Sequence, residues 1–324
     1  MRTRVAFVVC PSFHGATLLA LLLNNHSQIS ALGDMLPWLD ADSQACACGQ
    51  YVRDCEFWQD VSANVDTSRF LRRTTLLPAM PWPLARRQME GNSVPLSRAP
   101  ALNRGAGRLA GALVDVAVPI AWRLRRQPVT DFVETYRSFY SLVLEKHGTW
   151  MFVDGNKSWR KVALLARELQ PDAKVKVIHL VRDPRGFAAS CRHHGGADPR
   201  NTALLWAHLH RRMESLRSIA PYRLLRYEDL CARPDEEMRA LFRFLEVEPE
   251  DVVTAPQHPH KHHILGNQMF RTKVLFEHPE SSCLEFNFRL LPVLCEWLQL
   301  ALHGTDDGNG AHALAGATAP DAST

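Results

Sequence analysis

The sequence predicts an α/β protein in which helices flank a central, mainly parallel sheet. Short apolar runs alternate along the chain with segments of helical periodicity, a pattern typical of parallel strands joined by crossover helices. The chain has 324 residues, enough to bury a sizeable core. Hydrophobic residues make up 46% of it and charged residues 22%, which is ordinary for a globular protein.

The apolar runs place four strands, over residues 5–9, 150–153, 175–181 and 222–227. Helical spacing of apolar residues predicts helices over residues 18–23, 158–169, 184–193, 199–219, 234–245 and 284–302. We expect residues 1–302 to form a single domain. From residue 303 the composition changes to Gly, Ala, Asp, Thr and Ser, so residues 303–324 are expected to be a disordered tail.

A loop containing a glycine joins the first strand to the first helix. It reads Cys-Pro-Ser-Phe-His-Gly-Ala-Thr over residues 10–17. A strand, a tight loop and a helix in this order direct backbone N–H groups and a helix N-terminus at an anion. Gly15 permits close approach to the backbone, and Thr17 supplies a hydroxyl. The Gly-Lys-Ser/Thr ending of a Walker loop is missing, which disfavours a nucleoside or sugar kinase.

A second polar segment directly follows the strand expected at residues 175–181. It reads Arg-Asp-Pro-Arg-Gly-Phe-Ala-Ala-Ser from Arg182 to Ser190. Open α/β sheets bind ligands beyond the carboxyl ends of their strands. The guanidinium of Arg182 can hold a phosphate with two hydrogen bonds, and Ser190 can donate a third. The pair is a candidate clamp for a phosphomonoester; the alternative is a solvated arginine in a turn.

These two segments resemble the phosphate-binding motifs of sulfotransferases that use 3′-phosphoadenosine-5′-phosphosulfate (PAPS), and more narrowly those of the bacterial branch. Further segments resemble the same family in the same order, and together they cover most of residues 5–275. They are residues 25–34, 46–58, 153–157, 225–234 and 263–271. The resemblance implies a P-loop-like three-layer fold. It also implies an enzyme that transfers a sulfuryl group from PAPS and requires no metal.

The resemblance also implies which residues bind the co-substrate. The first loop would hold the 5′-phosphosulfate through Phe13, His14, Gly15, Ala16, Thr17 and Leu18. Arg182 and Ser190 would hold the 3′-phosphate. Tyr227 would contact the nucleotide or pack beneath it. A late loop that covers the nucleotide would contribute Gly266, Asn267 and Arg271.

Three residues are candidates for the catalytic steps. Asp34 stands where the family has a glutamate and is the first candidate for the base; an ordinary turn aspartate after Gly33 is the alternative. Lys157 would stabilise the sulfuryl oxygens, or it is simply a lysine at the start of a helix. His14 is the next candidate base.

The first loop departs from the family pattern. Phe13 stands in place of a basic residue, His14 in place of a serine and Ala16 in place of a threonine. One cation and two hydroxyls are therefore missing, although a protonated His14 would restore part of the charge. These departures favour an alternative function, a catalytically weak nucleotide-binding or membrane-docking protein with the same fold.

Two groups of residues raise the question of a metal. Cys46, Cys48 and Cys55 could bind zinc, but a structural site requires four ligands and no histidine is close in the sequence. A packed cysteine loop is therefore favoured. A proline-flanked loop also holds four histidines, for which a mobile polar loop is favoured over a metal site: His258, His260, His262 and His263. No metal site is predicted.

A variable basic insertion is expected at about residues 69–130. From Arg69 to Arg126 it holds eleven arginines and two acidic residues, whereas the formal net charge of the whole chain is +4. It is interpreted as a solvated lid, as a surface for an anionic acceptor or membrane, or as a nucleic-acid patch. Nucleic acid is disfavoured because no recognised binding module accompanies the charge. A basic face with Trp and Leu is compatible with peripheral membrane contact.

The sequence therefore predicts a PAPS-dependent sulfotransferase. Its acceptor would be a hydroxyl or amine of a small-molecule, carbohydrate or lipid-linked compound. No apolar run is long enough to span a membrane. A signal peptide would have to consume the first strand and its loop, so a cytoplasmic location is expected, with membrane association as an option.

Overall fold

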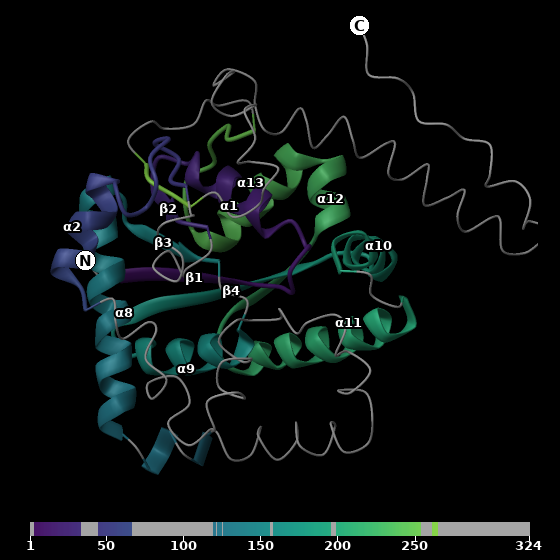
Figure 1. The fold of residues 1–324 in the computed structure, drawn as a ribbon, viewed down its shortest axis with the longest axis horizontal. Helices are drawn as coiled ribbons and strands as arrows, with labels where there is room; N and C mark the ends of the chain where they lie inside the picture. The colour runs from purple at the N-terminus through teal and green to yellow at the C-terminus, as the bar shows by residue number, and fades with distance from the viewer. Residues whose placement is uncertain are drawn as a thin grey trace, which may run out of the picture. The chain divides into compact units, whose positions relative to one another are not determined.

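The computed structural model describes residues 3–33, 45–66, 119–120, 122–124, 126–155, 158–195, 199–253 and 261–264. Within these residues five strands form one sheet in the order β2-β3-β1-β4-β5 (Figure 1). The strands are β1 (Thr3–Val9), β2 (Ile29–Ala31), β3 (Met151–Asp154), β4 (Ala173–Val181) and β5 (Tyr222–Arg226). Every neighbouring pair is parallel, which confirms the predicted sheet.

Helices cover both faces of the sheet, as predicted (Figure 1). One face carries α1 (Ala16–Asn24), α12 (Tyr227–Ala232) and α13 (Pro234–Leu245). The other carries α9 (Trp159–Leu169) and α11 (Pro199–Glu214), which continues into the 3-10 turn η3 (Ser215–Ser218). The helix α8 (Arg126–His147) contacts α9, β2 and β3, and α2 (Glu56–Asn64) packs on α8. The helix α10 (Pro184–Gly195) follows the carboxyl end of β4.

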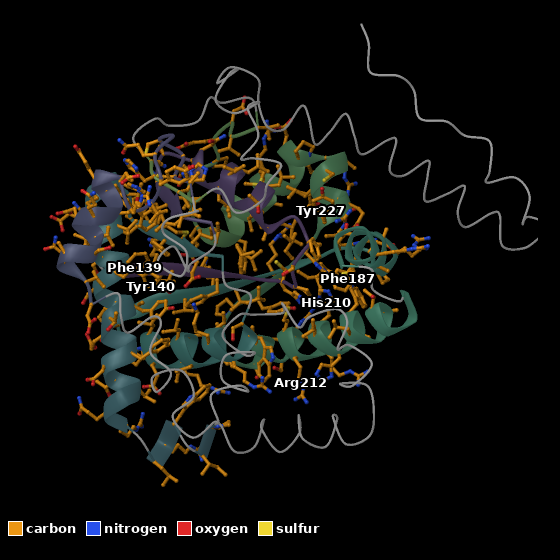
Figure 2. All side chains as sticks on the ribbon, in the orientation of Figure 1. Phe139, Tyr140, Phe187, His210, Arg212 and Tyr227 are labelled. Carbon is orange, nitrogen blue, oxygen red and sulfur yellow. The ribbon has the colours of Figure 1, made fainter. Side chains whose placement is uncertain are left out.

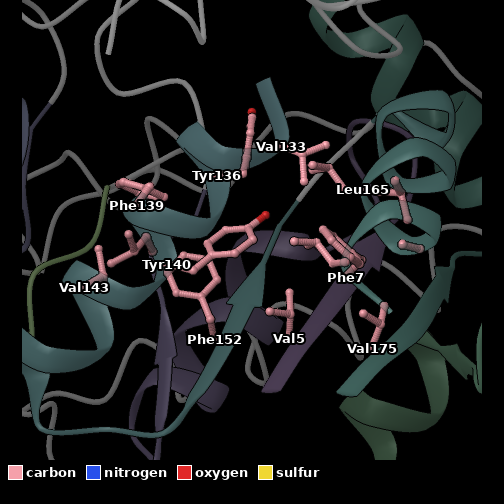
Figure 3. Close-up of a cluster of buried hydrophobic side chains, with 14 of the residues drawn as sticks. Val5, Phe7, Val133, Tyr136, Phe139, Tyr140, Val143, Phe152, Leu165 and Val175 are labelled. Atoms are coloured by element: carbon pink, nitrogen blue, oxygen red, sulfur yellow. The ribbon is translucent and has the colours of Figure 1, made fainter. Parts of the chain in front are cut away.

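The main hydrophobic core lies between the sheet and the helices α8 and α9. Val5 and Phe7 of β1 alternate along the strand and face Phe152 of β3 and Tyr140 of α8 (Figure 3). Each of these four side chains is buried. β1 reads as a continuous apolar run because, with neighbours on both edges and helices on both faces, none of its side chains from Val5 to Val9 reaches water.

Several predicted boundaries differ from the observed ones. The strand expected at 222–227 ends at Arg226 because Tyr227 already begins α12. The helix expected at 199–219 gives way to η3 after Glu214. β2, α2 and α8 were not predicted. The expected helix at 284–302, the tail from 303 and the basic insertion up to residue 118 lie outside the described residues.

No helix among the described residues is both long and apolar enough to cross a membrane. All described residues belong to the first of two compact units, Met1–Cys283. The predicted domain limit at residue 302 lies in the part of the chain that the structure does not describe.

Candidate functional site

The loop between β1 and α1 requires glycine at position 15. Gly15 caps α1 with a φ of 83°, in the left-handed region, and no side chain caps the helix there. A Cβ at this position would lie 2.3 Å from the ring of Tyr227, the first residue of α12. Both the backbone angle and the space therefore exclude a larger residue. The first N–H groups of α1 are left for another acceptor, as at anion sites on helix N-termini.

Arg182 links the two phosphate-binding segments predicted from the sequence. Its Nη1 donates to the carbonyl of Phe13 at 2.8 Å and to Oγ of Ser190 at 3.1 Å. Its guanidinium lies 5.1 Å from the ring centroid of Tyr227. Because β1 and β4 are neighbours in the sheet, the loops that follow them meet at one edge. This edge is where chain connections switch direction, the usual ligand site of such sheets.

The backbone around Arg182 is held by further hydrogen bonds. Trp206 of α11 donates its Nε1–H to the carbonyl of Arg182 at 2.9 Å. The N–H of Asp183 donates to a carboxylate oxygen of Glu228 at 2.8 Å. Asp183 in turn accepts two side-chain bonds from Arg185, and these lower the pKa of its carboxyl group. The turn that carries the arginine is thus fixed by α11 and α12.

Phe13 adopts an unusual backbone conformation. Its φ is 65°, a left-handed angle that is costly for a residue with a Cβ. Sparsely populated conformations of this kind are concentrated at functional loops. Here the conformation accompanies the bond between its carbonyl and Arg182. The Phe13 side chain is 36% exposed, at the position where the family has a basic residue.

A chain of hydrogen bonds runs from His14 into the protein. Nδ1 of His14 lies 2.9 Å from the carbonyl of Ser12, and its Nε2 lies 2.9 Å from Nε2 of His210. Nδ1 of His210 lies 2.7 Å from Nε2 of His179, whose Nδ1 bonds to the hydroxyl of Tyr222. We call His14, His210, His179 and Tyr222 the histidine chain. Figure 2 labels His210 on α11, at the end of the sheet near α10.

The carbonyl of Ser12 determines the direction in which the hydrogen bonds of the histidine chain run. A carbonyl only accepts, so the single proton of neutral His14 is on Nδ1 and its Nε2 accepts from His210. Each neutral histidine has one N–H. Nδ1 of His210 therefore accepts from Nε2–H of His179, and Nδ1 of His179 accepts from the hydroxyl of Tyr222. All ring nitrogens are satisfied when the three histidines are neutral.

Burial makes the neutral state of these histidines the stable one. It lowers the pKa of His14 and of His179 to about 3, and that of His210 to about 4. The protonation by which His14 would restore charge to the loop is therefore disfavoured at neutral pH. Both of its nitrogens are engaged, so a role for His14 as a base remains a prediction that would require its bond to His210 to open.

A cluster of buried polar side chains near the end of β3 was not predicted from the sequence. Tyr140 donates to Oδ2 of Asp154 at 2.6 Å, and Nζ of Lys161 donates to the hydroxyl of Tyr136 at 2.8 Å. Burial raises the pKa of both tyrosines, which keeps them protonated. The two tyrosines are four residues apart on α8, and that helical spacing was the available signal.

Asp34, Lys157, Gly266, Asn267 and Arg271 lie outside the described residues. The backbone segments that precede three of them are in contact. A Cβ on Gly155 would lie 2.6 Å from the carbonyl oxygen of Gly33, and a Cβ on Gly33 would lie 2.8 Å from that of Ile264. Gly33 has a φ of 80°. Three chain segments therefore meet one or two residues before Asp34, Lys157 and Gly266.

The fold and this site define an α/β protein with a candidate anion site where the loops after β1 and β4 meet. A model of the sulfotransferase family matches residues 7–251, and the chain belongs to that family. The resemblance seen in the sequence is thereby confirmed. The search of curated proteins found no match.

Solved structures of bacterial sulfotransferases are among the similar folds. The sulfotransferase domain from the curacin biosynthetic pathway is 15% identical, with a TM-score of 0.45 and 80% of each chain covered. The domain from the Synechococcus PCC 7002 olefin synthase is 17% identical, with a TM-score of 0.44, and the match covers 95% of this chain and 97% of that one. The sulfotransferase STF1 from Mycobacterium tuberculosis is 15% identical, with a TM-score of 0.40, covering 78% of this chain and 70% of that one.

Proposed function

We propose that this sulfotransferase moves a sulfuryl group from PAPS to a hydroxyl or amine of a small-molecule, carbohydrate or lipid-linked acceptor. The observation that carries the proposal is the position of Arg182. One guanidinium reaches the first loop through the carbonyl of Phe13 and also reaches Ser190, across the edge of the sheet. This places a permanent cation and a hydroxyl beside the uncapped N-terminus of α1.

On the donor side, the N–H groups of residues 13–18 would hold the 5′-phosphosulfate. Arg182 and Ser190 would hold the 3′-phosphate, with Tyr227 packed against both the loop and the guanidinium. The bound co-substrate supplies the sulfuryl group and a phosphate leaving group. The donors are already held by bonds to neighbouring elements, so little reorganisation is needed when charge develops on the leaving oxygen.

On the acceptor side, Asp34 would take the proton from the acceptor and Lys157 would stabilise the sulfuryl oxygens. Contact between the segments ending at Gly33, Gly155 and Ile264 supports this assignment, because each leads directly into one part of the proposed site. Gly266, Asn267 and Arg271 would then cover the nucleotide. Transfer of this kind depends on in-line positioning and charge stabilisation, and these residues suffice for both without a metal.

Arg182→Ala tests the donor site. The variant should bind 3′,5′-adenosine bisphosphate roughly 10- to 150-fold more weakly, because it loses hydrogen bonds from a charged donor. Calorimetry with the bisphosphate, AMP and ADP is the measurement, and the wild type should prefer the bisphosphate. Arg126→Ala is the control, because that side chain lies outside the two loops, is paired with Glu168 and is 71% exposed. Equal affinity of the wild type for AMP and the bisphosphate would sink the proposal.

A second function is favoured by the loop itself. Phe13 replaces the cation of the family, and His14 is neutral, so the loop adds no charge of its own. This favours a catalytically weak protein that binds the nucleotide or docks on a membrane. A mass-spectrometric screen of acceptors with PAPS separates the two functions. Bisphosphate binding without transfer to any acceptor would support the second one.

A further inference from the structure

Four potential metal ligands converge at one side of the first compact unit. The sulfurs of Cys46, Cys48 and Cys55 and a ring nitrogen of His262 all lie within 4.8 Å of one another. We call these four residues the cysteine cluster. No histidine is close to the three thiols in the sequence, but the fold brings His262, 207 residues after Cys55, beside them.

The distances match the edges of a tetrahedral zinc site. Sγ of Cys48 and Sγ of Cys55 are 3.6 Å apart, and Nδ1 of His262 lies 3.4 Å from Sγ of Cys46 and 3.3 Å from Sγ of Cys55. Ordinary Zn–S and Zn–N bond lengths give edges of about 3.8 Å between two sulfurs and about 3.6 Å between sulfur and nitrogen. Three of the six distances between ligand atoms are thus close to these edges, and the other three lie within 4.8 Å.

The backbone holds the two halves of the cluster together. Ala47 donates its N–H to the carbonyl of His263 at 2.9 Å, and Cys46 pairs with Ile264 in an antiparallel bridge. Between Cys46 and Cys48 there is one residue, fewer than the usual two to four between zinc-binding cysteines. The chain turns at Gly49, with a φ of 88°, and returns to Cys55.

Neighbouring groups orient the ligands. Cys55 is the N-cap residue of α2, so its sulfur lies at the positive end of that helix. The ring of His262 stacks on Phe57 with centroids 4.6 Å apart and parallel planes. Such surrounding contacts fix ligand orientation and strengthen metal binding.

We propose that Cys46, Cys48, Cys55 and His262 bind a zinc ion. Three thiolates and one imidazole form a soft donor set that suits zinc. Four protein ligands fill the tetrahedron and leave no position for a substrate, so the ion is structural rather than catalytic. The proposal does not depend on the identity of the sulfuryl donor.

The site has a path to solvent. A cavity of about 600 Å³ is lined by Cys48 and His262, together with Phe57, Lys146 and Asp60. Cys48 is exposed, whereas Cys46 and Cys55 are buried. A zinc ion can therefore enter beside Cys48 without opening the core.

The ion would fasten a late segment of the chain to the acceptor side of the proposed active site. Residues 261–264 include the proposed ligand His262, and the N–H of Ile264 donates to the carbonyl of Leu32 at 2.9 Å. Gly33 and Asp34 come next after Leu32, and Gly266 comes two residues after Ile264. Zinc would thus fix the backbone on which both segments enter the site.

Metal analysis of the full-length protein tests the proposal. Protein made in zinc-containing medium and purified without chelators should hold about one zinc ion per chain. Cys48→Ser should lower the zinc content at least about tenfold, and it changes an exposed side chain that the fold tolerates. Cys231→Ser, at a buried cysteine of α12 outside the cluster, is the control and should retain the zinc. Cobalt in place of zinc should give the visible absorption of tetrahedral cobalt bound to thiolates.

A chelator provides a second measurement that does not depend on any variant folding well. It should lower the Tm of the wild type and leave the Tm of Cys48→Ser unchanged, because a ligand stabilises only the form that binds it. A wild-type protein without zinc that takes up none on titration would overturn the proposal. Equal zinc loss from Cys231→Ser and Cys48→Ser would do the same, as would a disulfide between Cys48 and Cys55 in the purified protein.

Discussion

In the histidine chain each ring nitrogen points at one partner, whereas in the cysteine cluster four ligand atoms surround one point. Neighbours in the chain are bonded pairwise, with ring nitrogens 2.7 and 2.9 Å apart between His179, His210 and His14. In the cluster every ligand atom lies within 4.8 Å of the other three. Pairwise bonds satisfy neutral donors and acceptors, but a common centre is satisfied only by a cation. The two regions show that geometry, rather than residue type, separates a hydrogen-bonded histidine from a metal ligand.

Burial acts on both regions by favouring neutral side chains. It lowers the pKa of the three histidines in the chain, and it raises the pKa of the thiols of Cys46 and Cys55. The neutral imidazoles form a complete set of bonds. Neutral thiols are only weak donors and acceptors, so the cluster gains little from hydrogen bonding alone. The same burial therefore leaves the histidine chain complete, whereas the thiols would have to lose their protons to bind a cation.

The largest expected effect tests whether the histidine chain takes part in the chemistry. Asp34→Asn should lower kcat roughly 10²- to 10⁴-fold, because a general base is lost, while the Kd for 3′,5′-adenosine bisphosphate stays the same. Rates with an acceptor found in the screen are the measurement. Asp172→Asn, which removes an exposed carboxylate paired with Arg137, is the control. An unchanged rate would assign the role of general base to His14. The hydrogen bond between His14 and His210 would then have to break.

The second largest effect is a loss of stability at acidic pH. The unfolded histidines have a pKa of about 6.5, so between that pH and about 3 the unfolded state binds more protons than the folded one. The stability that they contribute is complete above pH 6.5 and is lost as the pH falls. At pH 5 the free energy of unfolding should decrease, by an amount on the order of 2 kcal/mol or more for the histidine chain as a whole.

Urea unfolding at pH 7.5 and pH 5 measures this loss. Burial is the largest cause of the lowered pKa of His14 and His179, with smaller contributions from Arg182 and Arg217, so the loss should persist in variants that keep these histidines buried. Cys48→Ser shows which of the two regions causes the loss, because it removes the proposed metal site and leaves the histidine chain intact. If the acid sensitivity of Cys48→Ser vanished, the loss would belong to the cluster and not to the chain.

The smallest effect concerns the missing charge in the first loop. Phe13→Arg should tighten binding of PAPS by about 0.5–1 kcal/mol, a few-fold in Kd, because an exposed cation gains only a modest interaction. Calorimetry is again the measurement, and the zinc content should not change. Weaker binding by a folded variant would show that Phe13 is an adaptation to its own ligand rather than a loss.

The sequence predicted those parts of the fold and site that depend on local patterns. β4 is a mostly apolar run rich in valine, and α13 begins with Pro234 followed by three acidic residues, so both could be found. Arg182 and Ser190 are eight residues apart within one strand-to-helix connection, and their contact follows from that spacing. β2 was missed because it has only three residues and its central Ser30 is polar. That serine bonds to Thr149 and His147, which no local pattern reveals.

Contacts between distant segments could not be predicted. His14 meets His210 across 196 positions, and Cys55 meets His262 across 207. Histidines such as these read as polar loop residues when their partners are unknown. His263, expected in a mobile loop, is instead buried, with Nδ1 lying 3.3 Å from the amide nitrogen of Asn24. Only the folded sheet, by bringing these segments to one edge, supplies that information.

The strand order has a consequence for synthesis on the ribosome. β1 lies at the centre of the sheet between β3 and β4, yet Met151, which begins β3, comes 142 positions after Val9, which ends β1. At about 5–20 residues per second, the apolar residues of β1 wait roughly 7–28 s for their first hydrogen-bonded neighbour. Nascent chains that end before β3 therefore carry an unpaired central strand, and protecting it is a task for chaperones rather than for the fold.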